Sequence, residues 1–216
     1  EITTVVLNIN DRFGPVILGV REKVIYGSGY IEDVLCGKRF RISSRSFYQI
    51  NPVQTEKLYS AAIGLAGLTG NETVLDAYCG IGTIGLSASD KAKQVIGVEI
   101  NRDAVNDAIA NARLNGVKNC WFTVGDAGKY MEQMAADKVK PDVVFMDPPR
   151  AGSDERFLSS LLKCAPKRIV YISCNIDTQR RDLDVLLSGG YKLRRIQPVD
   201  MFPYTEHIEC VVMLEK

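Results

Sequence analysis

The stretch TVLDAYCGIGTIG, residues 73–85, determines the expected fold. It opens with an apolar run typical of a buried β-strand, followed by a glycine-rich turn and the start of a second apolar run. A strand, such a turn and a helix form the first unit of an open α/β sheet. In these sheets, ligands bind beyond the carboxyl ends of the strands. We therefore expect a functional site around residues 76–85.

The alternation of strands and helices continues from this stretch almost to the end of the chain. Further strand-like runs, separated by helical stretches, occupy residues 94–100, 120–124, 142–147 and 168–173. This pattern predicts an α/β fold of the Rossmann-like class, with a mostly parallel sheet covered on both faces. Residues 191–199 and 208–214 have no helix between them and are predicted to form a C-terminal antiparallel hairpin.

The first 50 residues have a different pattern. Short β-rich runs at residues 3–9, 24–26, 30–35 and 39–42 are broken by Gly14-Pro15, by residues 27–29 and by Gly37, which predicts a small meander. Asn51 and Pro52 then form a good helix cap and first helical position. We therefore divide the chain into a β-rich segment, residues 1–50, and an α/β domain, residues 51–216. Because it starts at Glu1, without an initiator Met or signal peptide, we expect a fragment of a longer protein.

The composition excludes several classes of protein. The 216 residues include 27 basic and 26 acidic side chains, so bulk charge does not indicate a nucleic-acid partner. No apolar run approaches the roughly 18 residues of a membrane span. The six cysteines form no Cys-x-x-Cys pair, which is a poor ligand set for zinc or iron–sulfur clusters and is typical of free thiols in the cytoplasm.

Charge decides between two cofactors at the glycine-rich turn. Gly80, Gly82 and Gly85 match the dinucleotide-binding pattern, and Glu99 follows Gly80 at the spacing of a ribose-binding acid. However, the turn contains no Lys or Arg.

The strand ends carry four carboxylates, Asp76, Glu99, Asp126 and Asp147. They would repel a pyrophosphate and attract a sulfonium ion with an α-amino group, which favours S-adenosylmethionine. We expect Glu99 to accept hydrogen bonds from the ribose hydroxyls, Asp126 to reach the adenine, and Asp76 to hold the methionine end or the turn. Asp76 and Asp126 could instead act only as helix caps.

A thiol follows the fifth strand of the predicted sheet. Cys174 precedes Asn175, a plausible helix cap, so the positive end of a helix dipole is expected to favour its thiolate. The motif Asp147-Pro-Pro-Arg150 lies where a methyl acceptor must sit. It resembles the motif of enzymes that methylate exocyclic amines, but Arg150 replaces their aromatic ring and no thiol follows the prolines.

A nucleophilic thiol and a base would suit methylation at carbon 5 of a pyrimidine. A thiolate that adds at carbon 6 activates carbon 5, and a base must then remove the carbon 5 proton. Residues 201–209 offer that base. His207 is predicted to share a face of the last strand with Glu209, and a supporting hydrogen bond is favoured over a direct catalytic role for it.

Five phrases together resemble the RNA uracil-5-methyltransferases: FYQIN at 47–51, DAYCGIG at 76–82, DPPR at 147–150, ISCN at 172–175 and FPYTEHIE at 202–209. The resemblance implies a class I methyltransferase fold for residues 51–216, and part of that family's central domain before it. It also implies that Cys174 is the nucleophile and Glu209 the base. The implied S-adenosylmethionine ligands are Gln49, Tyr78, Thr83, Glu99, Asp126 and Asp147. Thr83 stands where the family often has Asn, and Asp126 where Asn is also seen.

The expected substrate is a flipped-out or unpaired uridine in RNA, with rRNA favoured over tRNA, and the expected oligomeric state is a monomer. From the resemblance, Phe47 or Tyr48 would stack on the uracil, with Arg150 and His207 nearby. Residues 34–55 contain no acidic side chain, and their basic and aromatic residues suit a single-stranded RNA surface: Lys38, Arg39, Phe40, Arg41, Arg45, Phe47 and Tyr48. The alternative for this stretch is a solvated basic strand face with aromatic side chains in the core.

Two other functions remain open from the sequence. One is a class I methyltransferase that acts on another substrate, such as cytosine in RNA. The other is a non-catalytic RNA-binding fragment, because the resemblance implies an amino-terminal RNA-binding domain that this chain does not contain.

Overall fold

The computed structural model describes residues 1–11, 13 and 17–216. The β-rich segment contains β1 (Thr4–Ile9), β2 (Arg21–Gly27), β3 (Tyr30–Leu35) and β4 (Lys38–Ser43). The α/β domain contains α1 (Pro52–Ala66), β5 (Thr73–Ala77), α2 (Thr83–Ala88), the 3-10 helix η1 (Ser89–Lys91), β6 (Gln94–Glu99), α3 (Arg102–Leu114), β7 (Cys120–Val124), α4 (Ala127–Ala136), β8 (Val143–Met146), α5 (Glu155–Cys164), β9 (Arg168–Ser173), α6 (Ile176–Ser188), β10 (Lys192–Val199) and β11 (Glu209–Glu215). None of the helices in the described ranges is long and apolar enough to cross a membrane.

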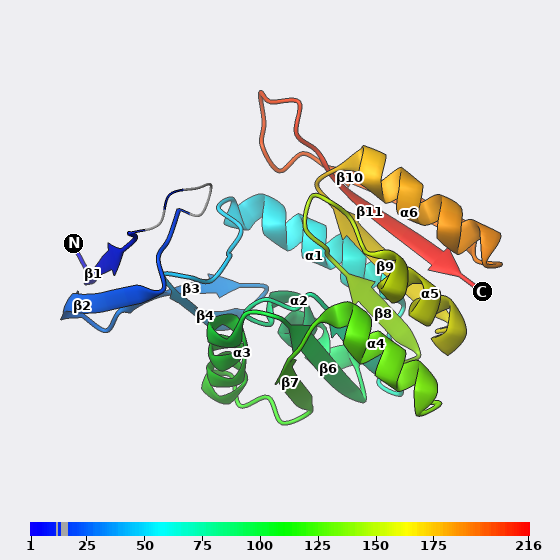
Figure 1. Ribbon diagram of the computed structural model, residues 1–216, viewed down its shortest axis with the longest axis horizontal. Coiled ribbons are helices and arrows are strands. Elements are labelled where there is room, and N and C mark those ends of the chain that lie inside the picture. The colour runs from blue at the N-terminus through cyan, green and yellow to red at the C-terminus, as the bar shows by residue number, and fades with distance from the viewer. Residues whose placement is uncertain (12, 14–16) are drawn as a thin grey trace.

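A mostly parallel sheet forms the centre of the molecule (Figure 1). Within the described residues it has seven strands, in the order β10-β11-β9-β8-β5-β6-β7. The strands from β5 to β9 pair in parallel, whereas β11 is antiparallel to both β9 and β10. The predicted α/β class and the C-terminal antiparallel hairpin are both confirmed.

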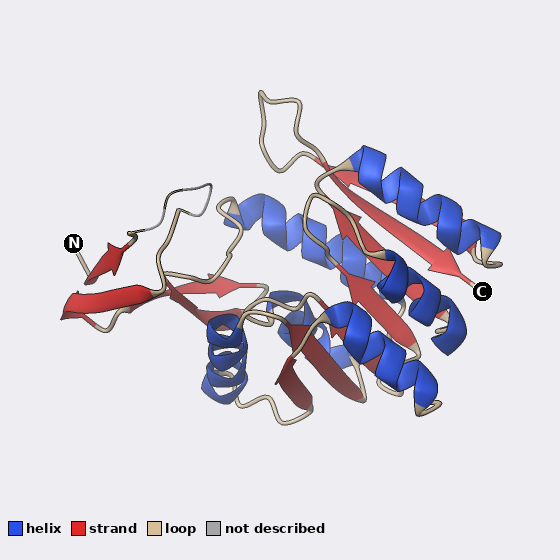
Figure 2. Ribbon diagram, in the orientation of Figure 1, coloured by secondary structure: helices blue, strands red, loops and turns tan. Residues whose placement is uncertain are grey.

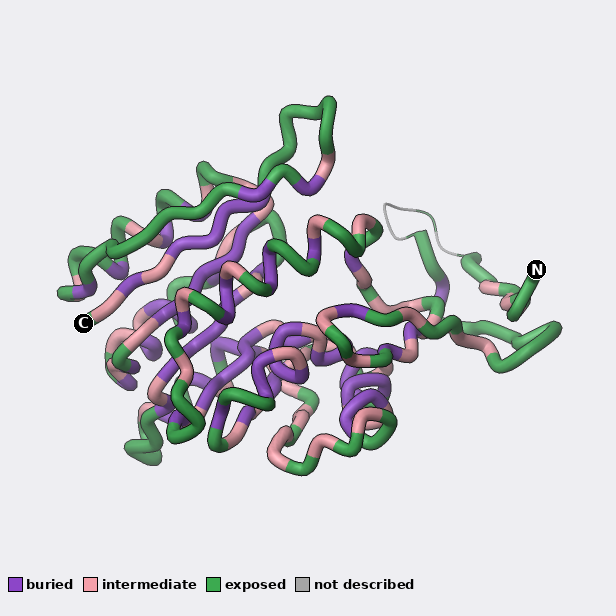
Figure 3. Tube along the Cα trace, turned by 180° about the vertical axis from the view of Figure 1, so that it is seen from behind, coloured by how far each residue is buried: buried purple, intermediate pink, exposed green. Residues whose placement is uncertain are grey.

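Helices cover both faces of this sheet (Figure 2) because its strands present apolar side chains to both sides. Val74 of β5 packs in one core cluster with α1, α2 and α3, and its neighbour Leu75 packs in a second cluster with α4, α5 and α6. The central strands are accordingly buried, whereas much of the β-rich segment is exposed (Figure 3).

The β-rich segment does not form the single meander that the sequence predicted. β1 pairs with β2 and β3 pairs with β4, in two separate antiparallel sheets. The chain turns between the two sheets at Gly27 and Gly29, which have φ angles of 75° and 81°. The break expected at Gly14-Pro15 lies outside the described residues.

The β3–β4 hairpin is attached to the α/β domain through polar side chains of α3. Asn115 and Asn111 each exchange two hydrogen bonds with the backbone of β4, at Arg39 and Arg41 respectively. One turn further back, Asp107 accepts a hydrogen bond from Ser43 N at 3.1 Å. Four helical residues rise about 6 Å and two strand residues about 6.6 Å, so the helix repeat matches alternate residues of the strand.

The same hairpin contributes side chains to the main core. Leu35, Phe40 and Ile42 belong to the cluster that also contains Val74 and Leu58. The predicted boundary does coincide with the start of α1, where the Asn51 side chain accepts a hydrogen bond from Gln54 N and Pro52 is the first helical residue. The division of the chain into two units remains a prediction.

The buried member of the α3 ladder should contribute most to stability. Asn111 is fully buried and also donates to Ile81 O at 3.2 Å. Asn111→Ala leaves several backbone groups without partners, so we expect the free energy of unfolding to fall by about 2–4 kcal/mol. Asn115→Ala, at the more exposed end of the ladder, should cost less than about 1 kcal/mol. Urea unfolding measures both, and equal losses would contradict this account of the ladder.

Candidate active site

The carboxyl ends of the parallel strands meet at one edge of the sheet, and β11 starts at the same edge because it runs antiparallel to β9. A cavity of about 530 Å³ lies there. Its lining includes nine of the twelve residues predicted from the sequence: Phe47, Gln49, Tyr78, Glu99, Asp126, Asp147, Arg150, Cys174 and Glu209. The volume is in the range of small-molecule and cofactor sites.

The turn after β5 is shaped by a buried carboxylate. Asp76 Oδ2 accepts a hydrogen bond from Gly85 N at 2.8 Å, at the start of α2. A Cβ at Gly85 would lie 2.8 Å from this oxygen and 3.0 Å from Val95 Cγ1, so only glycine lets the helix approach the strand this closely. Burial raises the pKa of Asp76 to about 7. Its other oxygen, Oδ1, is buried and has no hydrogen-bond partner within the described residues.

Glu99 and Asp126 combine a structural role with a place in the cavity wall. Glu99 accepts hydrogen bonds from Gly80 N at 3.1 Å and from Asn101 N at 2.8 Å. Asp126 caps α4 by accepting from Lys129 N at 2.9 Å. The alternative of a helix cap therefore applies to Asp126, but the capping residue also lines the cavity.

Tyr78 directly follows β5, has a φ of 67°, and contacts two residues that do not line the cavity. Its hydroxyl donates to Ser153 Oγ at 3.3 Å, and its ring lies 5.4 Å from that of Phe157. Burial raises the pKa of this tyrosine to about 12. The sequence reasoning missed Ser153 and Phe157, although they follow the DPPR motif directly.

Cys174, Asp147 and Glu209 come together on the other side of the cavity. Cys210 of β11 pairs with Ser173 of β9. Because the two strands are antiparallel, Glu209, one residue before Cys210, lies level with Cys174, one residue after Ser173. Burial raises the pKa of Glu209 to about 6. Burial, and then the carboxylates of Glu209 and Asp76, raise the pKa of Asp147 well above its usual value.

The expectation that the thiolate of Cys174 is favoured in the free protein is wrong. Asn175 does cap α6 behind it, accepting from Asp177 N and Thr178 N. However, burial and the carboxylates of Glu209 and Asp147 raise the pKa of the thiol, and Arg150 only partly offsets them. The thiol must therefore lose its proton before it can act as a nucleophile.

Three predicted residues lie outside the cavity lining. The hydroxyl of Thr83 is 3.0 Å from the Tyr59 hydroxyl, and Tyr48 donates to Asp33 Oδ2 at 3.1 Å. His207 does not share a strand face with Glu209, because β11 begins at Glu209 and the preceding loop is exposed. That prediction failed because residues 201–206 form bends and a turn, and His207 and Ile208 have no regular secondary structure.

The basic stretch of residues 38–45 is largely paired with acids. Lys38 contacts Asp90 at 2.8 Å, and the remaining cations of the stretch pair with acids of β2, β3 and α3: Arg39 with Glu32, Arg41 with Asp107, and Arg45 with Asp103 and Glu22. Phe40 is completely buried. The stretch therefore attaches the hairpin to the domain. Of the rings predicted to face RNA (Phe40, Phe47 and Tyr48), only Phe47, which is 75% exposed, lines the cavity.

No group of three or more His, Cys, Asp or Glu side chains in the described ranges could hold a metal ion.

A family model described as tRNA (uracil-5-)-methyltransferase matches residues 16–216. The chain belongs to this family. The resemblance inferred from the five motifs is thereby confirmed.

Two relatives and one solved structure are similar to this chain. Uncharacterized RNA methyltransferases of Halalkalibacterium halodurans and Listeria innocua are 52% and 51% identical, over 100% and 99% of this chain. The tRNA (uracil-54, C5)-methyltransferase of Pyrococcus abyssi, solved in complex with S-adenosyl-L-homocysteine, is 31% identical with a TM-score of 0.81. That match covers 99% of this chain and 51% of the Pyrococcus chain. The chain spans about half the length of these proteins, 47% for both of the RNA methyltransferases.

The electrostatic effect of Glu209 on the Cys174 thiol can be tested by alkylation with iodoacetamide. Glu209→Gln removes a carboxylate that raises the pKa of the Cys174 thiol, so Cys174 should be alkylated several-fold faster at pH 8. The difference should shrink as the pH falls through about 6 and be lost well below it, because Glu209 becomes protonated in the unmodified protein. Mass spectrometry of the peptide that contains Cys174 gives the rates.

Glu206→Gln is the matched control, since Glu206 lies in the exposed loop before β11. Equal alkylation rates in the Glu206 and Glu209 variants would show that Glu209 does not influence the thiol.

Proposed function

We propose that the protein transfers a methyl group from S-adenosylmethionine to carbon 5 of a uridine in RNA, through a covalent bond between Cys174 and carbon 6 of the base. The observation that carries this proposal is the convergence of a thiol and a carboxyl group of raised pKa, Cys174 and Glu209, in the wall of one cavity. Family membership supports the same reaction.

The chemistry of the cavity suits the proposed cofactor. Three acids of the strand ends, Glu99, Asp126 and Asp147, line it, and the buried Asp76 of β5 has an oxygen without a hydrogen-bond partner among the described residues. Burying carboxylates is costly unless a positive group compensates them, and a sulfonium with an α-amino group would do so. Bound S-adenosylmethionine would supply an electrophilic methyl group. We assign Glu99 to the ribose hydroxyls and Asp126 to the adenine edge, with Gln49 and Tyr78 completing the wall.

The acceptor side supplies the nucleophile and the base. Once deprotonated, the Cys174 sulfur adds to carbon 6 of the uracil, and carbon 5 then becomes nucleophilic enough to take the methyl group. Glu209 removes the proton from carbon 5, which breaks the carbon–sulfur bond and releases the product. A carboxyl pKa of about 6 suits this step, because the group is ionised near neutral pH and more basic than an ordinary carboxylate.

The uridine must leave its stack to reach Cys174, at a cost of roughly a few kcal/mol. The exposed ring of Phe47 in the cavity wall supports a stacking role on the flipped base. We also propose that Arg150 contacts the RNA, since its side chain is exposed and has no ion-pair partner in the described part of the chain.

The identity of the RNA is a separate proposal. The sequence prediction favoured rRNA over tRNA, whereas the family description and the Pyrococcus enzyme name tRNA. Mass mapping of total RNA, from cells that lack the full-length protein and from cells in which it is restored, would identify the modified nucleotide. The same experiment would detect 5-methylcytidine if the substrate were cytosine. Action as a monomer in the cytoplasm is part of the proposal.

The proposed nucleophile, Cys174, can be compared with Cys79, which lies in the glycine-rich turn after β5. Cys174→Ala should abolish methyl transfer and leave the affinity for S-adenosylhomocysteine nearly unchanged, because the thiol bonds to the uracil of the RNA and not to the cofactor. Cys79→Ala should retain much of the activity, since Cys79 is buried and outside the cavity lining. Methyl transfer from labelled cofactor and calorimetry measure the two quantities. The opposite ranking of the variants would mean that the nucleophile has been misassigned.

Glu209→Gln should separate the two halves of the reaction. Thiol addition and methyl transfer do not need this base, but removal of the carbon 5 proton does. Methylated RNA should therefore stay covalently bound to Cys174, carry label from the cofactor, and survive denaturing gel electrophoresis. The double variant with Cys174→Ala should form no such adduct. Release of 5-methyluridine at an undiminished rate by the single variant would show that another group takes the proton.

A further inference from the structure

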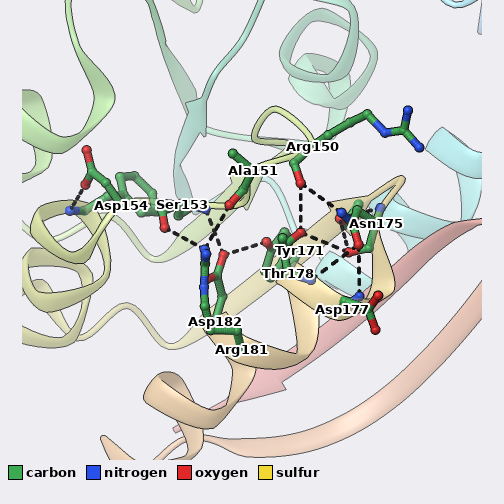
Figure 4. A network of polar contacts seen from close by, with 12 residues as sticks. Arg150, Ala151, Ser153, Asp154, Tyr171, Asn175, Asp177, Thr178, Arg181 and Asp182 are labelled. Atoms are coloured by element: carbon green, nitrogen blue, oxygen red, sulfur yellow. Dashed lines mark hydrogen bonds and ion pairs between the residues drawn. The ribbon is translucent and has the colours of Figure 1, made fainter.

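Asp182 of α6 is completely buried and accepts hydrogen bonds from three different parts of the chain. Its Oδ2 accepts from Ser153 N at 2.8 Å and from the Tyr171 hydroxyl of β9 at 2.7 Å. Its Oδ1 accepts from Arg181 at 2.9 Å and 2.6 Å. Arg181 also donates to Ala151 O at 3.0 Å and Ser153 O at 3.2 Å (Figure 4). An acid and a guanidinium of one helix thus hold the backbone of residues 151–153.

Residues 151–153 pack tightly against the side chains of Arg181 and Asp182. Gly152 has a φ of 77°, and its N donates to Pro149 O at 2.8 Å. A Cβ at Gly152 would lie 2.5 Å from Arg181 Nη2 and 2.7 Å from Asp182 Oδ2. The loop conformation and the Asp182–Arg181 pair are therefore matched to each other.

The first turn of α6 holds the start of the same loop. Arg150 O accepts hydrogen bonds from Asn175 Nδ2 and from the Thr178 hydroxyl, both at 3.1 Å. In Figure 4 this carbonyl points toward α6, whereas the guanidinium of Arg150 points away from the network. Because Asn175 directly follows Cys174, the loop and the thiol are attached to the same helix end.

One end of the loop lines the cavity, and the other contacts a residue of the cavity wall. Arg150 lines it next to Cys174 and is the cation that partly offsets the effect of Glu209 and Asp147 on the thiol. At the other end, the Ser153 hydroxyl accepts the hydrogen bond from Tyr78. One loop thus connects the acceptor side of the cavity with its cofactor side.

We propose that Asp182 and Arg181 are positioning residues, which hold residues 150–153 so that Arg150 stays beside Cys174 and Ser153 stays beside Tyr78. This inference rests on the proposed function, which identifies one side of the cavity as the acceptor side and the other as the cofactor side. Neither residue lines the cavity, so they act only through the loop.

Arg181→Ala is the most informative variant, because the Arg181 side chain is 56% exposed, so its removal leaves no cavity in the core. It does leave the buried Asp182 carboxylate without its cation, so the melting temperature should fall. In the full-length protein, we expect the affinity for S-adenosylhomocysteine to fall by about two- to tenfold, the effect of losing one neutral hydrogen bond at Tyr78. Alkylation of Cys174 by iodoacetamide at pH 8 should slow by about threefold or more, because Arg150 is no longer held beside the thiol. Asp182→Asn should change both quantities in the same direction.

Asp184→Asn is the matched control, since Asp184 lies on the exposed side of the same helix. It should leave affinity, alkylation and melting temperature unchanged. A folded Arg181→Ala protein with wild-type cofactor affinity and wild-type alkylation across the pH range would overturn the proposal, even if Asp182→Asn failed to fold.

The alkylation test is independent of the reaction itself, because iodoacetamide needs neither RNA nor cofactor. If the unmodified protein made no 5-methyluridine but the alkylation of Cys174 still slowed in Arg181→Ala, the proposed function would be wrong and the positioning role would stand.

Discussion

The site depends on one electrostatic constraint, the confinement of several carboxyl groups at a single edge of the sheet. Asp76, Asp147 and Glu209 come from different strands, and burial raises the pKa of each. Carboxylates withdrawn from water are stabilised by a positive partner or by protonation. The same constraint raises the pKa of Cys174, so the thiol and the carboxyl groups form one coupled set. A cationic ligand would reduce the repulsion on the cofactor side of the cavity, and proton transfer would reduce it around Cys174 and Glu209.

Hydrogen bonds between distant segments keep this charged edge in shape. On one side, α3 uses side chains one turn apart to bind alternate residues of β4, which places the β-rich hairpin against the domain. On the other side, α6 binds the loop after β8 through Asn175, Thr178 and Asp182. In both cases a helix supplies polar side chains to backbone groups that lack a neighbouring strand, because a buried backbone group needs a partner.

Much of the site could be predicted because parallel strands end at the same edge. Residues at or just after a strand end, such as Glu99, Asp147 and Cys174, could be placed together from the alternation of strands and helices alone. The capping role of Asn51 and Asn175 was equally accessible, since caps depend on a few neighbouring residues. The failed prediction for Cys174 concerns its environment. A helix end behind Cys174 suggests a thiolate, but the opposing carboxylates come from strands far away in the sequence.

The sequence by itself determined the order of the strands and helices, the α/β class and the family, because periodicity, caps and contiguous motifs are local properties of the chain. Only the tertiary structure decided which cations of residues 38–45 are paired, that Phe40 is buried, and that His207 lies before the strand rather than on it. It also revealed the contacts of Asp182 and Arg181 with the loop after β8. The physical reason is that burial and most of this pairing depend on residues distant in the sequence, such as Lys38 and Asp90, which are 52 positions apart, and no local pattern identifies them.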